Sequence, residues 1–319
     1  MKEDSMRRWF ETVAVLFFLG SSMVASDEFF SHTRLGALAD AHEAFLDGDH
    51  ARVAPLIRDA IREAAGDAEV TRSGIALLEL LYVARAGRPI SVDWELPPNL
   101  DRLKISVVRR DNAYWTEYGL RVWGKQREAG LVDQIRLTRA DGEVVLDRRE
   151  QRGTWWSLDD AEDGPEFELA FWENEHRPAD GLYDLHLEFA DGTQWDAWLI
   201  LSDAVASETP TITQPAAGEI LESSRPRFEF EDFRSPEHDG FERRSLWYSL
   251  SNRSASSPLF SRWEVHPTRT GFEPEQELSD GDYTVSVFFA EDRRFGPLLI
   301  GRNSGSLVPF SVRTAAVEP

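Results

Sequence analysis

Residues 180–190 read DGLYDLHLEFA, and residues 280–290 read DGDYTVSVFFA. Both stretches place an Asp-Gly turn before a tyrosine, and apolar residues then follow at alternate positions. This pattern predicts a strand with one buried face, headed by a tyrosine whose ring points inward and whose hydroxyl can bond to backbone at the corner. Because the copies lie one hundred residues apart, about one domain length, we expect Tyr183 and Tyr283 to head equivalent strands of two duplicated β-sandwiches.

The rest of the mature sequence fits this interpretation. Short alternating runs separated by turn signals fill residues 89–203, and a similar profile fills residues 211–314. Between them, residues 204–210 (AVASETP) are small, polar and end in proline, which predicts a linker, and residues 315–319 form a tail. The sequence therefore predicts a first β-sandwich at 89–203 and a second at 211–314.

The first 26 residues predict a secretion signal. Arg7 and Arg8 precede the apolar run 13–19 (VAVLFFL), and Val24-Ala25-Ser26 offers small residues for cleavage after Ser26. The apolar run is shorter than the about 20 residues that a membrane-spanning helix needs. We therefore expect export to the periplasm or the extracellular space, with no transmembrane span after cleavage. An uncleaved N-terminal anchor is the alternative.

Residues 27–88 predict helices. Apolar residues recur at three- and four-residue steps before the break at Asp47-Gly48-Asp49 and again over 53–64, and a third helix is expected over 75–84 with Ser73 as its N-cap. Residues 41–61 (AHEAFLDGDHARVAPLIRDAI) resemble one tetratricopeptide-type helical hairpin. A solenoid, however, requires several such repeats. A plain helical hairpin or three-helix cap is therefore the preferred interpretation.

Composition excludes several classes of function. The formal net charge of −22 repels phosphate backbones, so we expect no nucleic-acid binding. The absence of cysteine removes disulfides, thiol catalysis and thiolate metal sites. The seven histidines form no HExxH pair, and the sequence has neither a G-x-S-x-G elbow nor a Gly-rich phosphate loop. We therefore expect no enzymatic activity and no cofactor. An enzyme of unrecognised type is the least favoured of three functional hypotheses.

Residues 211–233 (TITQPAAGEILESSRPRFEFEDF) resemble the opening of bacterial immunoglobulin-like and fibronectin type III-like domains. The resemblance implies a mainly β fold with an N-terminal α segment, in which the helical cap precedes two antiparallel immunoglobulin-like β-sandwiches. It also implies a binding module or spacer. The overall layout further resembles an uncharacterised family of periplasmic proteins encoded near envelope-stress two-component systems, without a diagnostic motif.

Two stretches carry candidate site residues. Adjacent Trp155 and Trp156 cannot both point inward on a regular strand, so one should be exposed as a sugar- or protein-binding platform or be covered by the helical cap. The residues Asp159, Asp160, Glu162 and Asp163 have the hard oxygen ligands that calcium prefers, but they lack the order of an EF-hand loop. A solvated loop is the simpler interpretation.

The leading hypothesis is a non-catalytic, exported envelope protein that acts as a structural or protein-interaction module. Its expected partner is an envelope protein or a cell-wall component, and the oligomeric state is not predicted. The alternative hypothesis is a carbohydrate- or peptidoglycan-binding module that uses exposed Trp155 or Trp156.

Overall fold

The structure of the chain is a computed structural model. It describes residues 36–65, 67–86, 88–112, 116–159, 164–173, 178–202, 209–231, 243–254, 258–265 and 270–314. The predicted secretion signal, the tail and most of the predicted linker lie outside these residues. None of the helices in the described ranges is long and apolar enough to cross a membrane.

Three helices open the described chain: α3 (Ala39–Leu46), α4 (His50–Glu63) and α5 (Ala68–Ala84). Helix α5 begins seven residues before the predicted start at Ile75, and its N-cap is Asp67, not Ser73. The Asp67 carboxylate accepts hydrogen bonds from the amides of Glu69 and Val70, at 2.9 and 3.1 Å. These bonds satisfy donors that a helix start leaves open, which explains the earlier boundary.

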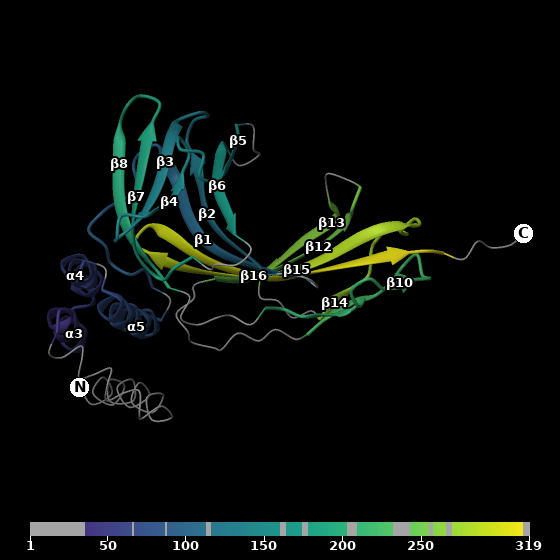
Figure 1. Ribbon diagram of the computed structural model, residues 1–319, viewed down its shortest axis with the longest axis horizontal. Coiled ribbons are helices and arrows are strands. Elements are labelled where there is room, and N and C mark those ends of the chain that lie inside the picture. The colour runs from purple at the N-terminus through teal and green to yellow at the C-terminus, as the bar shows by residue number, and fades with distance from the viewer. Residues whose placement is uncertain are drawn as a thin grey trace, which may run out of the picture.

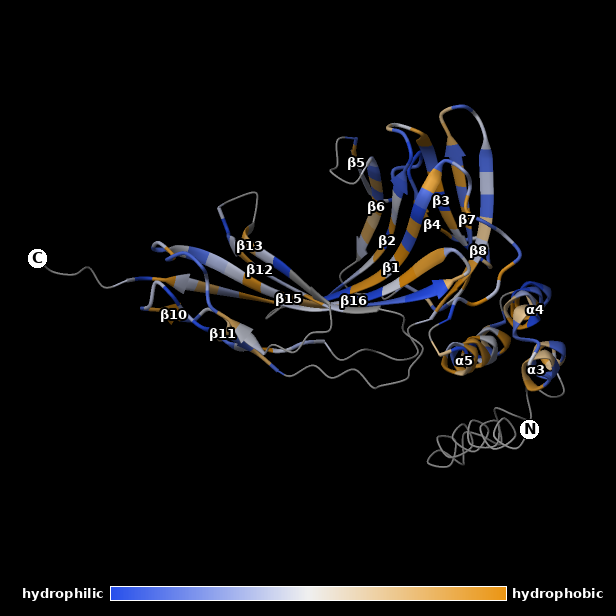
Figure 2. Ribbon diagram, turned by 180° about the vertical axis from the view of Figure 1, so that it is seen from behind, coloured by the Kyte–Doolittle hydropathy of each residue, from blue (hydrophilic) through white to orange (hydrophobic). Residues whose placement is uncertain are grey.

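The first sandwich consists of two facing sheets. One contains, in spatial order, β1 (Leu100–Asn112), β2 (Thr116–Gln126), β6 (Glu166–Glu173) and β5 (Thr154–Leu158). The other contains β4 (Val144–Asp147), β3 (Val132–Arg139), β7 (Gly181–Phe189) and β8 (Gln194–Leu201). Hydrophobic and hydrophilic residues alternate along these strands (Figure 2), and the apolar ones fill the core between the sheets.

The second sandwich repeats this plan. Its larger sheet contains β13 (Pro258–Val265), β12 (Arg243–Asn252), β15 (Gly281–Phe295) and β16 (Leu298–Val312), with β10 (Ile220–Leu221) beside β16. The facing sheet contains β14 (Gly271–Phe272), β11 (Phe228–Phe230) and β9 (Ile212–Gln214). Buried aromatic rings, among them Phe228, Tyr248 and Phe289, dominate its core.

The two tyrosine-headed strands occupy the same place in their sheets. Strand β7 is third in the order β4-β3-β7-β8, and β15 is third in the order β13-β12-β15-β16. The chain is thus mainly β, with an N-terminal three-helix segment followed by immunoglobulin-like sandwiches, so the predicted fold class is confirmed.

The hairpin of β15 and β16 joins the two sandwiches into one continuous sheet. Each strand has 15 residues, a length of about 50 Å in extended conformation. Strand β16 pairs in parallel with β1 of the first sandwich over nine residue pairs, from Lys104↔Leu299 to Asn112↔Leu307. At the hairpin tip, the fully buried Phe295 and Leu298 belong to the first core. Figure 1 shows β15 and β16 extending from the second sandwich into the first.

The helices are fastened to the first sandwich by polar contacts. The Trp198 ring of β8 donates its Nε1 proton to Asp93 Oδ1 at 2.7 Å, and the other Asp93 oxygen pairs with Arg58 of α4 at 2.5 Å. Helix α5 lies against β7, and its Glu79 pairs with Arg293 of β15. The helices therefore pack beside β7 and β8, at the end of the molecule that holds the hairpin tip (Figure 1).

Candidate functional site

One face of the nine-stranded sheet is covered by neither of the other two sheets. Along β15, Tyr283, Val285, Val287 and Phe289 point into the second core, and Phe295 on the same face points into the first. Both cores therefore lie on the odd-numbered side of β15, and the even-numbered side faces away from both. We call this side the open face; in Figure 1 it lies between the rising arms that end in β5 and β13.

Two aromatic rings lie flat on the open face, each above a glycine of the neighbouring strand. A Cβ atom added to Gly119 of β2 would lie 2.5 Å from the Trp172 ring of β6, and one added to Gly305 of β16 would lie 2.1 Å from the Phe288 ring of β15. Each ring therefore covers the backbone of its glycine, and a side chain at that position would displace the ring. Both rings remain partly exposed.

Arg110 of β1 connects the two rings. Its guanidinium carbon lies 3.8 Å from the Trp172 ring centroid and 5.9 Å from that of Phe288. Trp247 of β12 continues the row, with its ring centroid 5.2 Å from Phe288. The row Trp247–Phe288–Arg110–Trp172 thus crosses from the second sandwich into the first. Cation–π contact of this kind holds a guanidinium on an aromatic face at a preferred geometry.

The charges on the open face are largely balanced. Burial lowers the pKa of the Arg110 guanidinium, and Glu117 lies 3.5 Å away as its partner. Arg121 forms a bidentate pair with the buried Glu168 carboxylate. Lys104 Nζ lies 2.5 Å from Asp292. These three ion pairs leave a surface whose recognition chemistry is aromatic and hydrogen-bonding.

The predicted platform residues Trp155 and Trp156 lie on opposite faces of β5. The Trp155 ring stacks on Phe167 at 5.7 Å, with the Arg148 guanidinium 3.8 Å above it, so the rings and cation that it contacts belong to its own sandwich and not to the helical cap. Trp156 is 41% exposed. It stands opposite Glu168, which stands opposite Trp123 on β2, so Trp156 belongs to the open face.

Of the four predicted calcium ligands, the structure describes only Asp159. Asp159 accepts a hydrogen bond from the Ser157 hydroxyl at 2.9 Å, whereas Asp160, Glu162 and Asp163 lie outside the described residues. Within the described ranges, no group of three or more histidine or acidic side chains is arranged to hold a metal ion. The calcium site stays a prediction.

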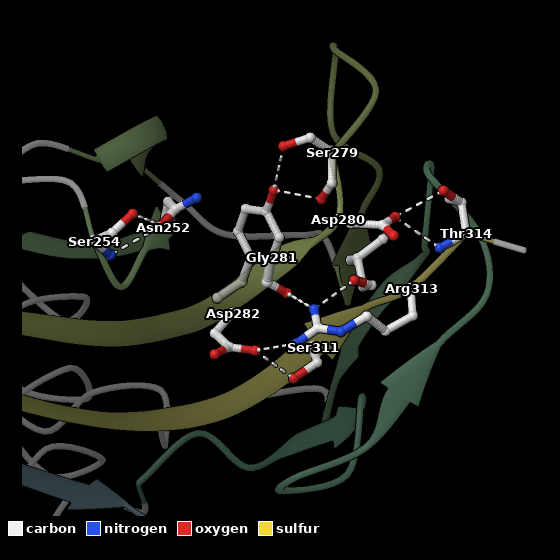
Figure 3. Close-up of polar contacts among 11 residues, drawn as sticks. Asn252, Ser254, Ser279, Asp280, Gly281, Asp282, Ser311, Arg313 and Thr314 are labelled. Carbon is white, nitrogen blue, oxygen red and sulfur yellow. Dashed lines mark hydrogen bonds and ion pairs between the residues drawn. The ribbon is translucent and has the colours of Figure 1, made fainter. Parts of the chain in front are cut away.

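Both corner tyrosines donate hydrogen bonds to the carbonyl four residues earlier. Tyr183 Oη lies 2.5 Å from the Ala179 oxygen, and Tyr283 Oη lies 2.7 Å from the Ser279 oxygen. Figure 3 shows the second corner, where Asp280 accepts bonds from the amide and hydroxyl of Thr314, at 2.8 and 2.7 Å. These contacts tie the end of β16 to the turn before β15, so they position strands.

Sequence reasoning missed the row on the open face, although a local signal existed. Gly119 and Gly305 interrupt strand patterns, and isolated strand glycines mark close approach by another group. The partners Trp172 and Phe288 lie on other strands, so only the sheet register brings each ring to its glycine.

Comparison with known proteins identifies a family and several solved structures of low sequence identity. The family model "Protein of unknown function (DUF2861)" matches residues 30–216, more than half of the chain. No curated protein matches the sequence.

Three of the solved structures to which the chain is similar are built from immunoglobulin-like or fibronectin-like modules. The tandem Ig repeats of Dlar match at 12% identity and a TM-score of 0.32, over 67% of this chain and 98% of that one. The fibronectin(III)-like modules of Clostridium thermocellum CbhA match at 10% and 0.22, over 68% and 97%. The FN1–FN3 domains of chicken CNTN1 match at 9% and 0.23, over 68% and 69%.

Proposed function

The chain belongs to the DUF2861 family, described as proteins of unknown function, and we propose that it is a non-catalytic, exported envelope protein that binds a protein partner on its open face. The observation that carries the proposal is the row Trp247–Phe288–Arg110–Trp172, which places partly exposed aromatic rings and an arginine on one rigid surface. Tryptophan, tyrosine and arginine are the residues most enriched where protein interfaces derive their energy.

Rigidity supports binding on this surface. The open face is built from consecutively hydrogen-bonded strands of both sandwiches, so its rings keep their spacing without a partner. A preorganised surface loses less conformational entropy on association than one that must be ordered first. Export rests on the apolar run 13–19 and the small residues 24–26 of the sequence. A role near envelope-stress signalling stays a prediction from resemblance.

Site-specific photo-crosslinking in cells tests the protein-binding proposal. A crosslinking amino acid replaces Trp156 on the open face or, as a matched exposed position, Ile220 on β10, which is 64% exposed. We expect one envelope protein to be captured from position 156 and not from position 220, and Phe288→Ala to reduce the capture. Identical products from both positions, or none from position 156, would contradict the proposal.

A second candidate is glycan binding, which the exposed ring of Trp156 favours. Trp156, Trp123 and Trp172 all belong to the open face, and flat aromatic surfaces can stack on the apolar faces of sugars. Titration with an uncharged chitin hexasaccharide should quench tryptophan fluorescence, and Trp156→Ala should lose the response. Trp195→Phe, whose ring packs edge-on against Trp94 near the helices, is the control. An unchanged titration in Trp156→Ala would remove this candidate.

A further inference from the structure

The duplicated corners of the two sandwiches enclose cavities at equivalent positions. In the first sandwich, Arg139 at the end of β3 is the register partner of Tyr183. In the second, Asn252 at the end of β12 is the register partner of Tyr283. A cavity lies beside each pair, between the two sheets at the end where the tyrosine-headed strand begins.

The two cavities differ in size. The first has a volume of about 410 Å³, and the second has a volume of about 180 Å³. Ligand sites in proteins typically occupy about 300–1,000 Å³, so only the first corner is large enough for a small organic molecule. Its apolar wall comes from both sheets and includes Leu120, Val145 and Phe171, together with the ring of Tyr118.

The two cavities also differ in charge. The first is lined by the guanidinium groups of Arg139 and Arg152 and by one carboxylate, Glu143, which pairs with Arg139 at 3.0 Å. The second is lined by Glu275 and Glu277, of which Glu277 pairs with Arg225 at 3.6 Å. Among the lining residues, the charged side chains are therefore mainly cationic in the first corner and anionic in the second, within a chain of net charge −22.

Arg152 is the cation with capacity for a ligand. Its Nη1 donates to the carbonyl of Val144, and no carboxylate of the described ranges lies within 4.0 Å of its guanidinium. Arg139, in contrast, is already paired with Asp141 and Glu143. An anionic group that enters the cavity would meet donors on Arg152 that remain open, at the rim of an apolar interior.

We propose that the first corner cavity binds a small monocarboxylate with an apolar chain, such as a medium-chain fatty acid. The chain packs against Leu120, Val145 and Phe171 between the sheets, and the carboxylate accepts hydrogen bonds from Arg152. The binding site is separate from the open face, so the proposal does not depend on the protein-binding function. The second corner excludes the same ligand by its smaller volume and its two carboxylates.

Calorimetric titration of the full chain with octanoate and with octan-1-ol tests the site. We expect one octanoate to bind per chain and the alcohol to bind about tenfold more weakly, because it lacks the charge-assisted hydrogen bond. Arg152→Gln should weaken octanoate binding by about tenfold and leave the alcohol unchanged. Equal binding of acid and alcohol, or an unaltered octanoate titration in Arg152→Gln, would overturn the proposal.

A pair of filling variants locates the binding. Val145→Phe adds a ring to the first cavity and should abolish octanoate binding, whereas Leu259→Phe adds the same ring at the second corner and should leave it unchanged. Octanoate that still binds to a folded Val145→Phe chain would show that the site lies elsewhere. If Val145→Phe does not fold, the Arg152→Gln comparison decides the outcome alone.

Discussion

Arg293 of β15 places its Nη1 atom 2.6 Å from both carboxylate oxygens of Glu79 on α5, a residue 214 positions earlier in the chain. The Arg293 side chain is 4% exposed and that of Glu79 15% exposed, so the pair is nearly removed from water. The ring of Tyr82 lies 4.6 Å from the same guanidinium. Helix α5 thereby holds the long hairpin close to its tip, two residues before Phe295.

Breaking the Arg293–Glu79 pair should destabilise the folded chain. Glu79→Gln leaves the Arg293 charge buried without its carboxylate, which should lower the free energy of unfolding by about 3 kcal/mol. Urea denaturation followed by circular dichroism measures the change. The control is Asp101→Asn at the exposed Arg127–Asp101 pair, where we expect a loss of less than about 1 kcal/mol.

A double variant separates pairing from packing. Glu79→Leu combined with Arg293→Met removes both charges. The double variant should lose less unfolding free energy than the sum of the losses in Glu79→Leu alone and Arg293→Met alone, because neither charge is left buried by itself. Additive losses would show that the two residues act independently.

Three tyrosines should respond differently to loss of the hydroxyl. Tyr183→Phe and Tyr283→Phe each leave a carbonyl without its donor and should each cost about 1–2 kcal/mol. The Tyr82 hydroxyl is buried with no hydrogen-bond partner in the described part of the chain, so Tyr82→Phe should be neutral or stabilising by up to about 1 kcal/mol. Thermal unfolding of the three variants measures the order. A loss in Tyr82→Phe as large as in Tyr183→Phe would contradict it.

The tip of the hairpin should stabilise the first sandwich. Phe295 is fully buried, and its ring packs edge-on against Trp198 at 5.1 Å. Phe295→Ala removes a large side chain from that core and should cost about 3–5 kcal/mol. Tryptophan fluorescence during urea unfolding reports the loss, and Leu259→Ala at a surface position is the control, with an expected change within about 0.5 kcal/mol. Phe295→Ala stability equal to that of Leu259→Ala would show that the tip contributes nothing.

Local sequence patterns were sufficient for the strands that carry their own signals. Asp-Gly turns preceded both tyrosine-headed strands, and the runs after Tyr183 and Tyr283 alternate as half-buried strands should. The structure has strands β7 and β15 at these positions. The turn signals at 140–142 and 190–193 likewise lie between paired strands.

The extension of β15 beyond Ala290 could not be predicted in this way. The residues Glu291, Asp292, Arg293 and Arg294 resemble a solvated turn in sequence, because charged side chains are rarely buried unless they are paired. Their partners Glu79, Lys104 and Arg302 come from three other elements. The strand continues because those partners balance its charges, and a single-sequence pattern contains no information about contacts of that separation.

The carboxylate of Asp280 should give the second sandwich an acid-sensitive contact. A hydrogen bond from the Thr314 hydroxyl, and another from the Thr314 amide, hold the pKa of Asp280 below its ordinary value near 3.8. A carboxyl group whose pKa is lowered on folding contributes stability above the unfolded pKa, and that contribution is lost as the pH falls through the lower, folded pKa. We therefore expect the end of β16 to loosen only below about pH 4, without a change near neutrality.

Amide hydrogen exchange measures this contact directly. Protection of the Thr314 amide should fall as the pH is lowered from 5 to 2, after correction for the intrinsic exchange rate, because the protonated carboxyl is a weaker acceptor. Asp280→Asn should show lower protection at pH 5 and little further dependence on pH. Asp191, whose pKa is lowered by its own Thr193 in the first sandwich, provides a matched site where Asp280→Asn should have no effect. Protection at Thr314 that does not change with pH in the unsubstituted chain would contradict the assignment.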